Sequence, residues 1–209
     1  MVPLYFIADA RPNTHPDSLL RNMAEALEGG ARLIQYRDKI NTRRTMYENA
    51  KKMREMTLEH HALFLINDQV DLALAVGADG VHLGQSDLPL RVGRSLLGKS
   101  AVIGISTHTL SEAIQAEKDG ADYIGLGPIF KTSTKTDAKA PVGIDAITTV
   151  KRAIHIPLYA IGGIQFSDLP KIFAAGADGI AAISAFDGDV RSHVQAWIMA
   201  IQIQKEQKG

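Results

Sequence analysis

Short apolar runs alternate along the chain with longer segments in which apolar residues recur at helical spacing. The run Leu4–Ala8 is followed by Asp17–Glu28, where Leu20, Ala24 and Leu27 lie three or four positions apart. Because the runs are short and nearly continuous, they predict strands of a parallel sheet covered by helices. The predicted strands are Leu4–Ala8, Leu33–Tyr36, Ala62–Ile66, Val81–Leu83, Ala101–Ile105, Tyr123–Leu126, Ile156–Ile161 and Ile180–Ser184. The predicted helices are Asp17–Glu28, Thr42–Glu59, Val70–Val76, Leu88–Leu97, Leu110–Lys118, Ile144–Ala153, Leu169–Ala175 and Val190–Gln204.

A Gly-Ala dipeptide recurs at helix-to-strand junctions and supports this order. The four copies are Gly30-Ala31, Gly77-Ala78, Gly120-Ala121 and Gly176-Ala177, and the last three continue with Asp. Glycine there ends a helix in the left-handed conformation, and the small alanine lets the chain turn into the sheet. Four independent helix caps are the alternative. No Pro- or Ser-rich linker divides the chain, so the pattern predicts one α/β domain over residues 1–209, a parallel barrel of strand–helix units.

Polar residues gather directly after the strands. In a parallel α/β barrel, catalytic groups lie at the carboxyl ends of the strands. Gln35, Arg37 and Lys39 follow the second strand two positions apart, so they share one face while the chain stays extended. Further clusters follow later strands, namely Asn67-Asp68, His82 to Asp87, Ser106-Thr107-His108, Lys131 to Lys135, Gly162-Gly163 and Ser184. Their convergence predicts an active site at this end of the barrel.

Each cluster also has a structural interpretation. Asn67-Asp68 are able to cap the helix that begins near Val70, and Asp87 is able to cap the helix at Leu88 with the help of Pro89. Arg37 and Lys39 taken alone could be ordinary surface charges. A histidine within a strand, such as His82, is usually a hydrogen-bonded core residue, and a Gly-Gly pair suits any tight turn.

The charges of the clusters, taken together, indicate a diphosphate ligand. Arg37, Lys39 and Lys135 provide cations for a polyanion. Asp68 and Asp87 would repel that anion unless a divalent cation lay between them. Mg²⁺ fits, because it binds oxygen ligands, keeps several waters and bridges one or two carboxylates to phosphates.

A second phosphate site is predicted on the later strands, where barrels often hold phosphate on backbone N–H groups. Gly163, Ile183 and Ser184 occupy this place. The segment from Pro128 to Gly143 is long for a strand–helix connection, and loops of that length often close over ligands. Its Thr132, Thr134 and Lys135 are the candidate contacts in that segment.

Composition narrows the range of partners. The 209 residues include 23 Lys plus Arg and 23 Asp plus Glu, so the zero net charge argues against a broad nucleic-acid or anionic-membrane surface. The chain has no cysteine, which excludes disulfides, a thiolate nucleophile and Cys-ligated metals. No apolar run reaches the roughly 20 residues of a membrane-spanning helix, and the first residues lack the basic segment of a signal peptide. We therefore expect a soluble, cytoplasmic protein acting on small molecules.

Several short motifs, in order, resemble the thiamine phosphate synthase (thiamine-phosphate pyrophosphorylase) family from Leu4 to about Phe186. The matching stretches are Gln35-Tyr36-Arg37-Asp38-Lys39, Asn67-Asp68, Gly80 to Asp87, Ser106-Thr107-His108, Gly127-Pro128-Ile129-Phe130, Thr132-Ser133-Thr134-Lys135, Pro141, Gly162-Gly163-Ile164 and Ile183-Ser184. Two positions depart from the usual family pattern. Tyr36 stands where Leu is frequent, and the first strand ends Ala8-Asp9-Ala10-Arg11 where Thr-Asp-Arg is more usual.

The resemblance implies a single-domain (β/α)8 TIM barrel. It implies a transferase that joins a hydroxymethylpyrimidine diphosphate to a thiazole phosphate, which carries a carboxylate in its physiological form. The residues implied to hold the pyrimidine diphosphate are Gln35, Arg37, Lys39, Asn67 and Lys135, with Ser106 against the pyrimidine. Asp68 and Asp87 are implied to bind Mg²⁺, and Thr132, Thr134, Gly163, Ile183 and Ser184 to hold the thiazole phosphate. Arg37, Lys39, Ser106 and Lys135 are the expected catalytic group, whereas His82 and His108 are expected to be structural or supporting.

Three alternatives remain at this point. A thiazole tautomerase shares the fold but has no diphosphate to bind, so it has no need for the full set of cations and acids. A phosphosugar epimerase or aldolase would be expected to use a Schiff-base lysine within a strand or a histidine-bound metal, and neither is evident. A non-catalytic relative that binds thiamine precursors is the third. The sequence leaves a homo-oligomer open.

Overall fold

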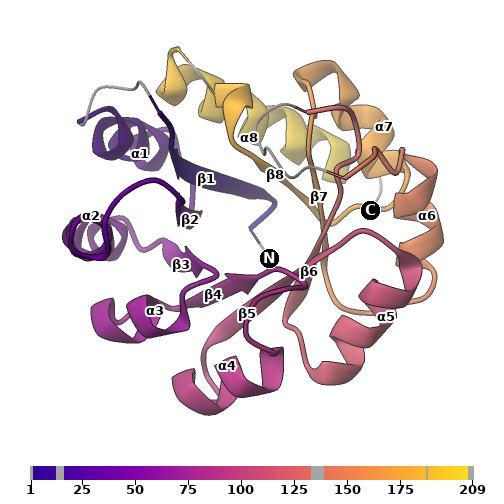
Figure 1. Ribbon diagram of the computed structural model, residues 1–209. Helices are drawn as coiled ribbons and strands as arrows, with labels where there is room; N and C mark the ends of the chain where they lie inside the picture. Colours follow the sequence, from indigo (N-terminus) through magenta and orange to yellow (C-terminus); the bar gives the residue numbers. More distant parts are fainter. Residues whose placement is uncertain (1, 13–16, 133–138, 187, 207–209) are drawn as a thin grey trace.

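The computed structural model describes residues 2–12, 17–132, 139–186 and 188–206. Within these residues, eight parallel strands pair in chain order and close into a barrel through β1 and β8, and helices surround it (Figure 1). The strands are β1 (Leu4–Ala10), β2 (Leu33–Asp38), β3 (Leu63–Asn67), β4 (Gly80–Leu83), β5 (Val102–Thr107), β6 (Tyr123–Leu126), β7 (Leu158–Ile161) and β8 (Gly179–Ala182). The helices are α1 (Ser18–Glu28), α2 (Arg43–Glu59), α3 (Val70–Val76), α4 (Leu90–Leu97), α5 (Leu110–Asp119), α6 (Asp145–Lys151), α7 (Leu169–Ala174) and α8 (Val190–Glu206), with short 3₁₀ turns η1 (Phe166–Asp168) and η2 (Ser184–Phe186). The predicted (β/α)8 barrel is confirmed.

Successive residues of each strand face opposite sides of the barrel wall, as strand geometry requires. Along β1, Tyr5 and Ile7 belong to a cluster inside the barrel, whereas Leu4, Phe6 and Ala8 pack in the outer core beneath the helices. The inner cluster also contains Leu33, Leu65, Tyr123, Tyr159 and Ala181. The interior is therefore filled with side chains, and a binding cavity is confined to an end of the barrel.

The final helix buries one face against this outer core. Val194, Trp197 and Ile201 of α8 are buried, whereas Ile198 is only half-buried. None of the helices among the described residues has the length and apolar content that crossing a bilayer requires.

The Gly-Ala repeat has the backbone conformation that its sequence predicts. The glycines have φ of +100° at Gly30, +62° at Gly77, +90° at Gly120 and +109° at Gly176. Residues with a Cβ rarely adopt these angles, so glycine is the residue suited to each junction. The last residues of α3 and α5 are followed directly by such a glycine.

The three aspartates that continue the repeat lie at the amino ends of the strands, which we call the N-terminal rim. Each accepts a hydrogen bond from a backbone N–H of the preceding strand and forms an ion pair with a cation of the helix before that strand. The sets are Asp79 with Phe64 N and Arg54 (both 2.8 Å), Asp122 with Ile103 N and Arg94 (both 2.7 Å), and Asp178 with Leu158 N and Lys151 (both 2.8 Å). Their shared contacts favour a true structural repeat over four unrelated caps.

Several element boundaries differ from the prediction. β1, β2 and β5 continue beyond their apolar runs into polar residues, because neighbouring strands still pair there, as Asp9 does with Arg37. β7 begins at Leu158 and not at Ile156, since Pro157 has no N–H to donate to a ladder. α4 begins at Leu90 and not at Leu88, and β8 ends before Ser184, which starts η2.

Candidate active site

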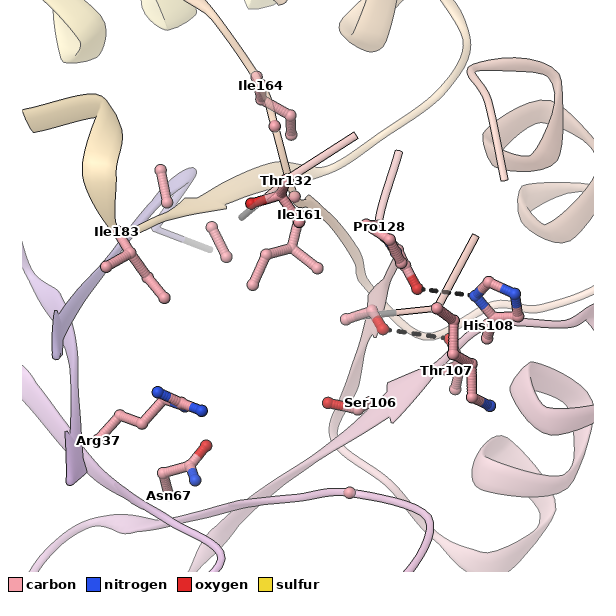
Figure 2. Close-up of a pocket in the computed structure, with 18 of the residues that line it drawn as sticks. Arg37, Asn67, Ser106, Thr107, His108, Pro128, Thr132, Ile161, Ile164 and Ile183 are labelled. Atoms are coloured by element: carbon pink, nitrogen blue, oxygen red, sulfur yellow. Dashed lines mark hydrogen bonds between the residues drawn. The ribbon is translucent and has the colours of Figure 1, made fainter. Parts of the chain in front are cut away.

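A cavity of about 310 Å³ opens at the carboxyl ends of the strands, which we call the C-terminal rim (Figure 2). Most of the predicted site residues line it. They are Arg37, Lys39, Asn67, Asp68, Asp87, Ser106, Thr132, Gly163, Ile183 and Ser184. In Figure 2, Arg37 and Asn67 lie on one wall, and Ile183, Ile161 and Thr132 lie on the other. Two predicted contacts, Thr134 and Lys135, lie outside the described residues.

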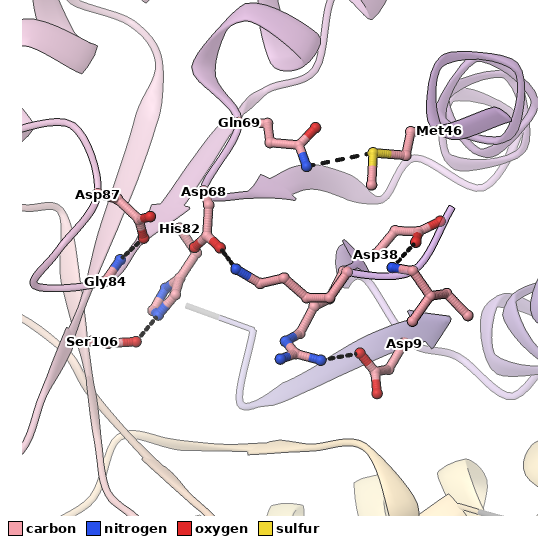
Figure 3. A network of polar contacts seen from close by, with 12 residues as sticks. Asp9, Asp38, Met46, Asp68, Gln69, His82, Gly84, Asp87 and Ser106 are labelled. Atoms are coloured by element: carbon pink, nitrogen blue, oxygen red, sulfur yellow. Dashed lines mark hydrogen bonds and ion pairs between the residues drawn. The ribbon is translucent and has the colours of Figure 1, made fainter. Parts of the chain in front are cut away.

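Asp68 and Asp87 lie together at the ends of neighbouring strands β3 and β4 (Figure 3). Asp68 forms an ion pair with Lys39, and Asp87 accepts a hydrogen bond of 2.7 Å from the backbone N–H of Gly84. Burial, followed by the neighbouring Asp87, raises the pKa of Asp68 above its ordinary value, although Lys39 opposes the shift. The two carboxylates thus lie close together, and the positive charge of Lys39 does not fully offset the effects of burial and of their mutual repulsion.

Asp68 also has an unusual backbone. Its φ of +61° lies in the left-handed region, and its N–H donates to the carbonyl of His82 at 2.8 Å. Asp adopts this conformation more readily than most residues, but at some cost in free energy. The hydrogen bond to His82 in β4 holds this conformation, and the Asp68 side chain lies beside that of Asp87 (Figure 3).

The capping interpretation of these two aspartates is wrong. α3 begins after Gln69 and α4 after Pro89, and neither helix has a side-chain cap. Asp87 binds the Gly84 N–H within its own loop instead. Both carboxylates are therefore part of the cavity wall.

The same pair is the candidate metal site. The described residues contain no group of three or more His, Cys, Asp or Glu placed to hold a metal. Mg²⁺ does not need such a cage, because it keeps waters and is usually held by one or two carboxylates together with substrate phosphates. The closeness of Asp68 and Asp87, and the raised pKa of Asp68, fit a divalent cation whose charge offsets their repulsion.

Arg37 is held by a carboxylate of the first strand. Its Nη1 lies 2.6 Å from Oδ1 of Asp9, whose side chain is only 3 % exposed, and Arg11 lies 3.7 Å from the other oxygen. The residues around Asp9 depart from the usual family pattern, but the carboxylate is present and its ion pair fixes the direction of Arg37. A guanidinium held in this way is preorganised to bind phosphate.

The opposite wall is neutral and rich in glycine. Gly162 and Gly163 have φ of +97° and +68°, and a Cβ on either would lie 2.5 Å from Pro128 or Lys131. Only glycine fits this close approach of β7 to the segment after β6. Together with Ile183 and Ser184, these residues form a wall of backbone and small side chains, which suits a phosphate bound through N–H groups.

The structure differs from the prediction at Gln35. The side chain shares the inner face with Arg37 and Lys39, as its spacing predicts, but it is 2 % exposed and does not line the cavity. Its Nε2 donates to the hydroxyl of Tyr5, one layer deeper in the barrel. Sequence spacing gives the face of a strand but not the depth at which each side chain lies.

Glu112 and Lys139 line the cavity, although the sequence did not single them out. Thr109 and Glu112 form a capping box at the start of α5, and Glu112 also accepts from the N–H of His108 at 2.5 Å and lies 3.5 Å from Lys139. His108 and Glu112 both line the cavity, as does Lys139. The capping box was readable as Thr-x-x-Glu before an apolar run, but its place beside the cavity was not.

The two histidines differ in their access to the cavity, since His108 lines it and His82 does not, and their supporting role stays a prediction. The ring of His108 contacts the carbonyl of Gly127 at 3.1 Å through Nδ1 (Figure 2). His82 is buried, and its Nε2 lies 2.9 Å from Oγ of Ser106 (Figure 3).

A closed (β/α)8 barrel with cations and a carboxylate pair at its C-terminal rim is typical of enzymes that bind phosphorylated small molecules at the strand ends. The chain belongs to the thiamine monophosphate synthase family, whose model matches residues 4–186. A thiamine-phosphate synthase of Chloroflexus aurantiacus is 46 % identical over 87 % of this chain and 83 % of that protein. One of Shouchella clausii is 42 % identical over 97 % of this chain and 98 % of that protein. The solved thiamine phosphate pyrophosphorylase of Pyrococcus furiosus superposes with a TM-score of 0.87 at 39 % identity, covering 97 % of this chain and 96 % of that one.

Proposed function

We propose that this protein is a thiamine-phosphate synthase. It transfers the pyrimidine methylene group of a hydroxymethylpyrimidine diphosphate to the nitrogen of a thiazole phosphate and releases diphosphate. Membership of the family supports the reaction. The single observation in the site that supports it is the meeting of Asp68, Asp87, Lys39 and Arg37 at one rim of the cavity.

The reaction needs charge neutralisation more than acid–base catalysis. The carbon–oxygen bond to diphosphate breaks, the electron-rich aminopyrimidine stabilises the cationic carbon, and the thiazole nitrogen lone pair forms the new carbon–nitrogen bond. The described site contains the groups for this step, with Arg37 and Lys39 beside the carboxylate pair. Fixed positions for both reactants and neutralisation of the leaving group lower the barrier.

The residue roles follow from the two walls. Arg37, Lys39 and Asn67 hold the diphosphate, and Ser106 contacts the pyrimidine. Asp68 and Asp87 would hold Mg²⁺, which would supply positive charge beside the leaving diphosphate. The residues assigned to the thiazole phosphate are Thr132, Gly163, Ile183 and Ser184, and the assignment of Thr134 to it and of Lys135 to the diphosphate stays a prediction.

A thiazole isomerase would leave the carboxylate pair without a purpose, since its substrate contains no diphosphate. A cytoplasmic location and a homo-oligomer also stay predictions.

The test is a reaction of both substrates with the protein and Mg²⁺. We expect thiamine phosphate and inorganic diphosphate to form in equal amounts, and chelation of the metal to stop the reaction. Isomerisation of the thiazole phosphate without consumption of the pyrimidine diphosphate would overturn the proposal, as would binding of both without turnover.

A further inference from the structure

A buried chain of polar groups connects the interior of the barrel with the cavity. Gln35 Nε2 donates to the hydroxyl of Tyr5, which lies 2.8 Å from the hydroxyl of Tyr123. The Tyr123 hydroxyl lies 2.9 Å from Nδ1 of His82, and Nε2 of His82 lies 2.9 Å from Oγ of Ser106. Only Ser106 of these five residues lines the cavity, so the first four act on a ligand through it.

The aromatic members of the chain are fixed by packing. The rings of Tyr5 and Tyr123 meet edge to face, with centroids 5.7 Å apart, and the ring of Tyr123 lies 5.5 Å from that of His82. Gly104 on β5 makes room for Tyr123, because a Cβ there would lie 2.0 Å from the Tyr123 ring. Each hydroxyl is thus held at one place along the chain.

Both tyrosines keep their protons. Burial raises the pKa of Tyr5 and of Tyr123 above the ordinary value for tyrosine. Each hydroxyl therefore has one hydrogen to donate and lone pairs that accept.

Gln35 sets the direction in which these hydrogens point. The Tyr5 oxygen accepts from Gln35, and its own hydrogen finds an acceptor in Tyr123. With that direction, Tyr123 would donate to Nδ1 of His82, and the imidazole hydrogen would lie on Nε2, which faces Ser106. In the reverse direction both Tyr123 and Gln35 would donate to Tyr5, and neither contact would offer an acceptor for the hydrogen of the buried Tyr5 hydroxyl. A buried hydroxyl whose hydrogen has no acceptor is disfavoured, because it loses its hydrogen bonds to water without replacing them.

We propose that the Gln35–Tyr5–Tyr123 chain holds His82 as the Nε2–H tautomer, so that Ser106 accepts from His82 and donates its own hydrogen to a ring-nitrogen acceptor of the bound substrate. His82 and Tyr123 are positioning residues in this arrangement. The opposite tautomer would consume the Ser106 hydrogen and leave the serine able only to accept. The chain thus selects an aromatic ligand that presents an acceptor nitrogen at Ser106. The identity of that ligand, a pyrimidine, rests on the proposed function. The tautomer of His82 does not depend on whether the enzyme turns over.

The direct test is the tautomer of His82 in the wild-type protein. Two-bond ¹H–¹⁵N correlation spectra distinguish a protonated from an unprotonated imidazole nitrogen, and the His82→Asn variant assigns the His82 signals. We expect a neutral ring with the hydrogen on Nε2. A hydrogen on Nδ1, or an imidazolium, would overturn the proposal whether or not the enzyme turns over.

Two matched tyrosine variants test the consequence for binding. Tyr123→Phe removes the hydroxyl that bonds His82, and it should raise the KM for the pyrimidine diphosphate about tenfold while leaving the KM for the thiazole phosphate unchanged, since one hydrogen bond is affected. Tyr159→Phe is the control. Tyr159 packs in the same inner cluster, with its ring 5.3 Å from that of Tyr123, but its hydroxyl donates to the Val2 carbonyl at 2.6 Å and not to the chain.

The outcomes separate the two proposals. In Tyr123→Phe we expect a changed Nε2–H signal together with the raised KM, and in Tyr159→Phe we expect neither. An unchanged His82 tautomer and KM in Tyr123→Phe would overturn the positioning role while the synthase assignment stands. A wild-type protein that shows the Nε2–H tautomer but forms no thiamine phosphate would overturn the synthase assignment and leave the hydrogen-bond chain intact.

Discussion

Aspartates lie at both ends of this barrel, and their surroundings are opposite. At the N-terminal rim, Asp79, Asp122 and Asp178 each have a backbone N–H and a cation as partners. At the C-terminal rim, Asp68 and Asp87 face each other, and Lys39 is the cation paired with Asp68.

The difference shows what each end of the fold is for. A carboxylate whose partners lie within the protein stabilises the folded state and has little left to offer a ligand. A carboxylate beside another carboxylate destabilises the protein until a ligand supplies positive charge, which is the usual exchange of stability for function at an active site. Asp79, Asp122 and Asp178 therefore have a structural role, whereas Asp68 and Asp87 have a functional one.

The largest expected effect comes from removing charge at the C-terminal rim. Asp68→Asn and Asp87→Asn should each lower kcat by about 100-fold or more, because the leaving diphosphate loses electrostatic stabilisation. Neither variant should be less stable at neutral pH, since the repulsion between the two carboxylates disappears. Steady-state release of diphosphate and urea unfolding measure both quantities. A near-normal rate in both variants would contradict the metal assignment.

The same kind of change at the N-terminal rim should have the opposite consequence. Asp79→Ala leaves the N–H of Phe64 and the guanidinium of Arg54 without their partner, so it should lower the free energy of unfolding by about 1–3 kcal/mol. The kcat per folded molecule should stay unchanged. Asp122→Ala is the matched variant at the equivalent position. Loss of activity without loss of stability in these variants would contradict the structural role assigned to the aspartates of the N-terminal rim.

A smaller effect concerns the dependence of stability on pH. The folded protein raises the pKa of Asp68, so it binds that proton more tightly than the unfolded chain does. The free energy of unfolding should therefore fall as pH rises from the ordinary pKa of Asp through the raised value. Asp68→Asn should lack this loss and gain stability relative to the wild type across that window. Urea unfolding over a pH series without Mg²⁺ is the measurement. If the free energy of unfolding depended on pH in the same way in the wild type and in Asp68→Asn, the repulsion between Asp68 and Asp87 would be contradicted.

The smallest effect is expected away from both rims. Arg191 and Glu28 form a pair of 3.3 Å in which both side chains are at least half exposed. Arg191→Gln should change the free energy of unfolding by no more than about 0.5 kcal/mol and leave kcat unchanged, because water and salt screen such a pair. If the free energy of unfolding fell as much as in Asp79→Ala, the stabilising effect of an aspartate or glutamate ion pair would not depend on its place at the N-terminal rim.

The order of strands and helices was predictable because each element is marked locally. Apolar runs give the strands, and the Gly-Ala junctions give the turns between helix and strand. The polar ends of β1, β2 and β5 were not predictable in this way, since residues such as Asp9 and Thr107 are held in strands by their neighbours and not by their own character.

The sequence predicts those residues of the site that come directly after the end of a strand. Spacing by two placed Arg37 and Lys39 on the inner face, and both line the cavity. The pairing of Arg37 with Asp9, 28 positions away, depends on the register of β1 with β2. The contacts of His82 with Tyr123 and of Tyr5 with Tyr123, 41 and 118 positions apart, depend on the closure of the barrel. No local pattern contains that information.

Calorimetric titration of inorganic diphosphate tests the central claim most directly. The wild-type protein should bind diphosphate in the presence of Mg²⁺ and lose most of that affinity when the metal is chelated. In Asp68→Asn the affinity should be low under both conditions. Equal binding of diphosphate by the wild type with and without Mg²⁺, or an unchanged metal dependence in Asp68→Asn, would contradict the account.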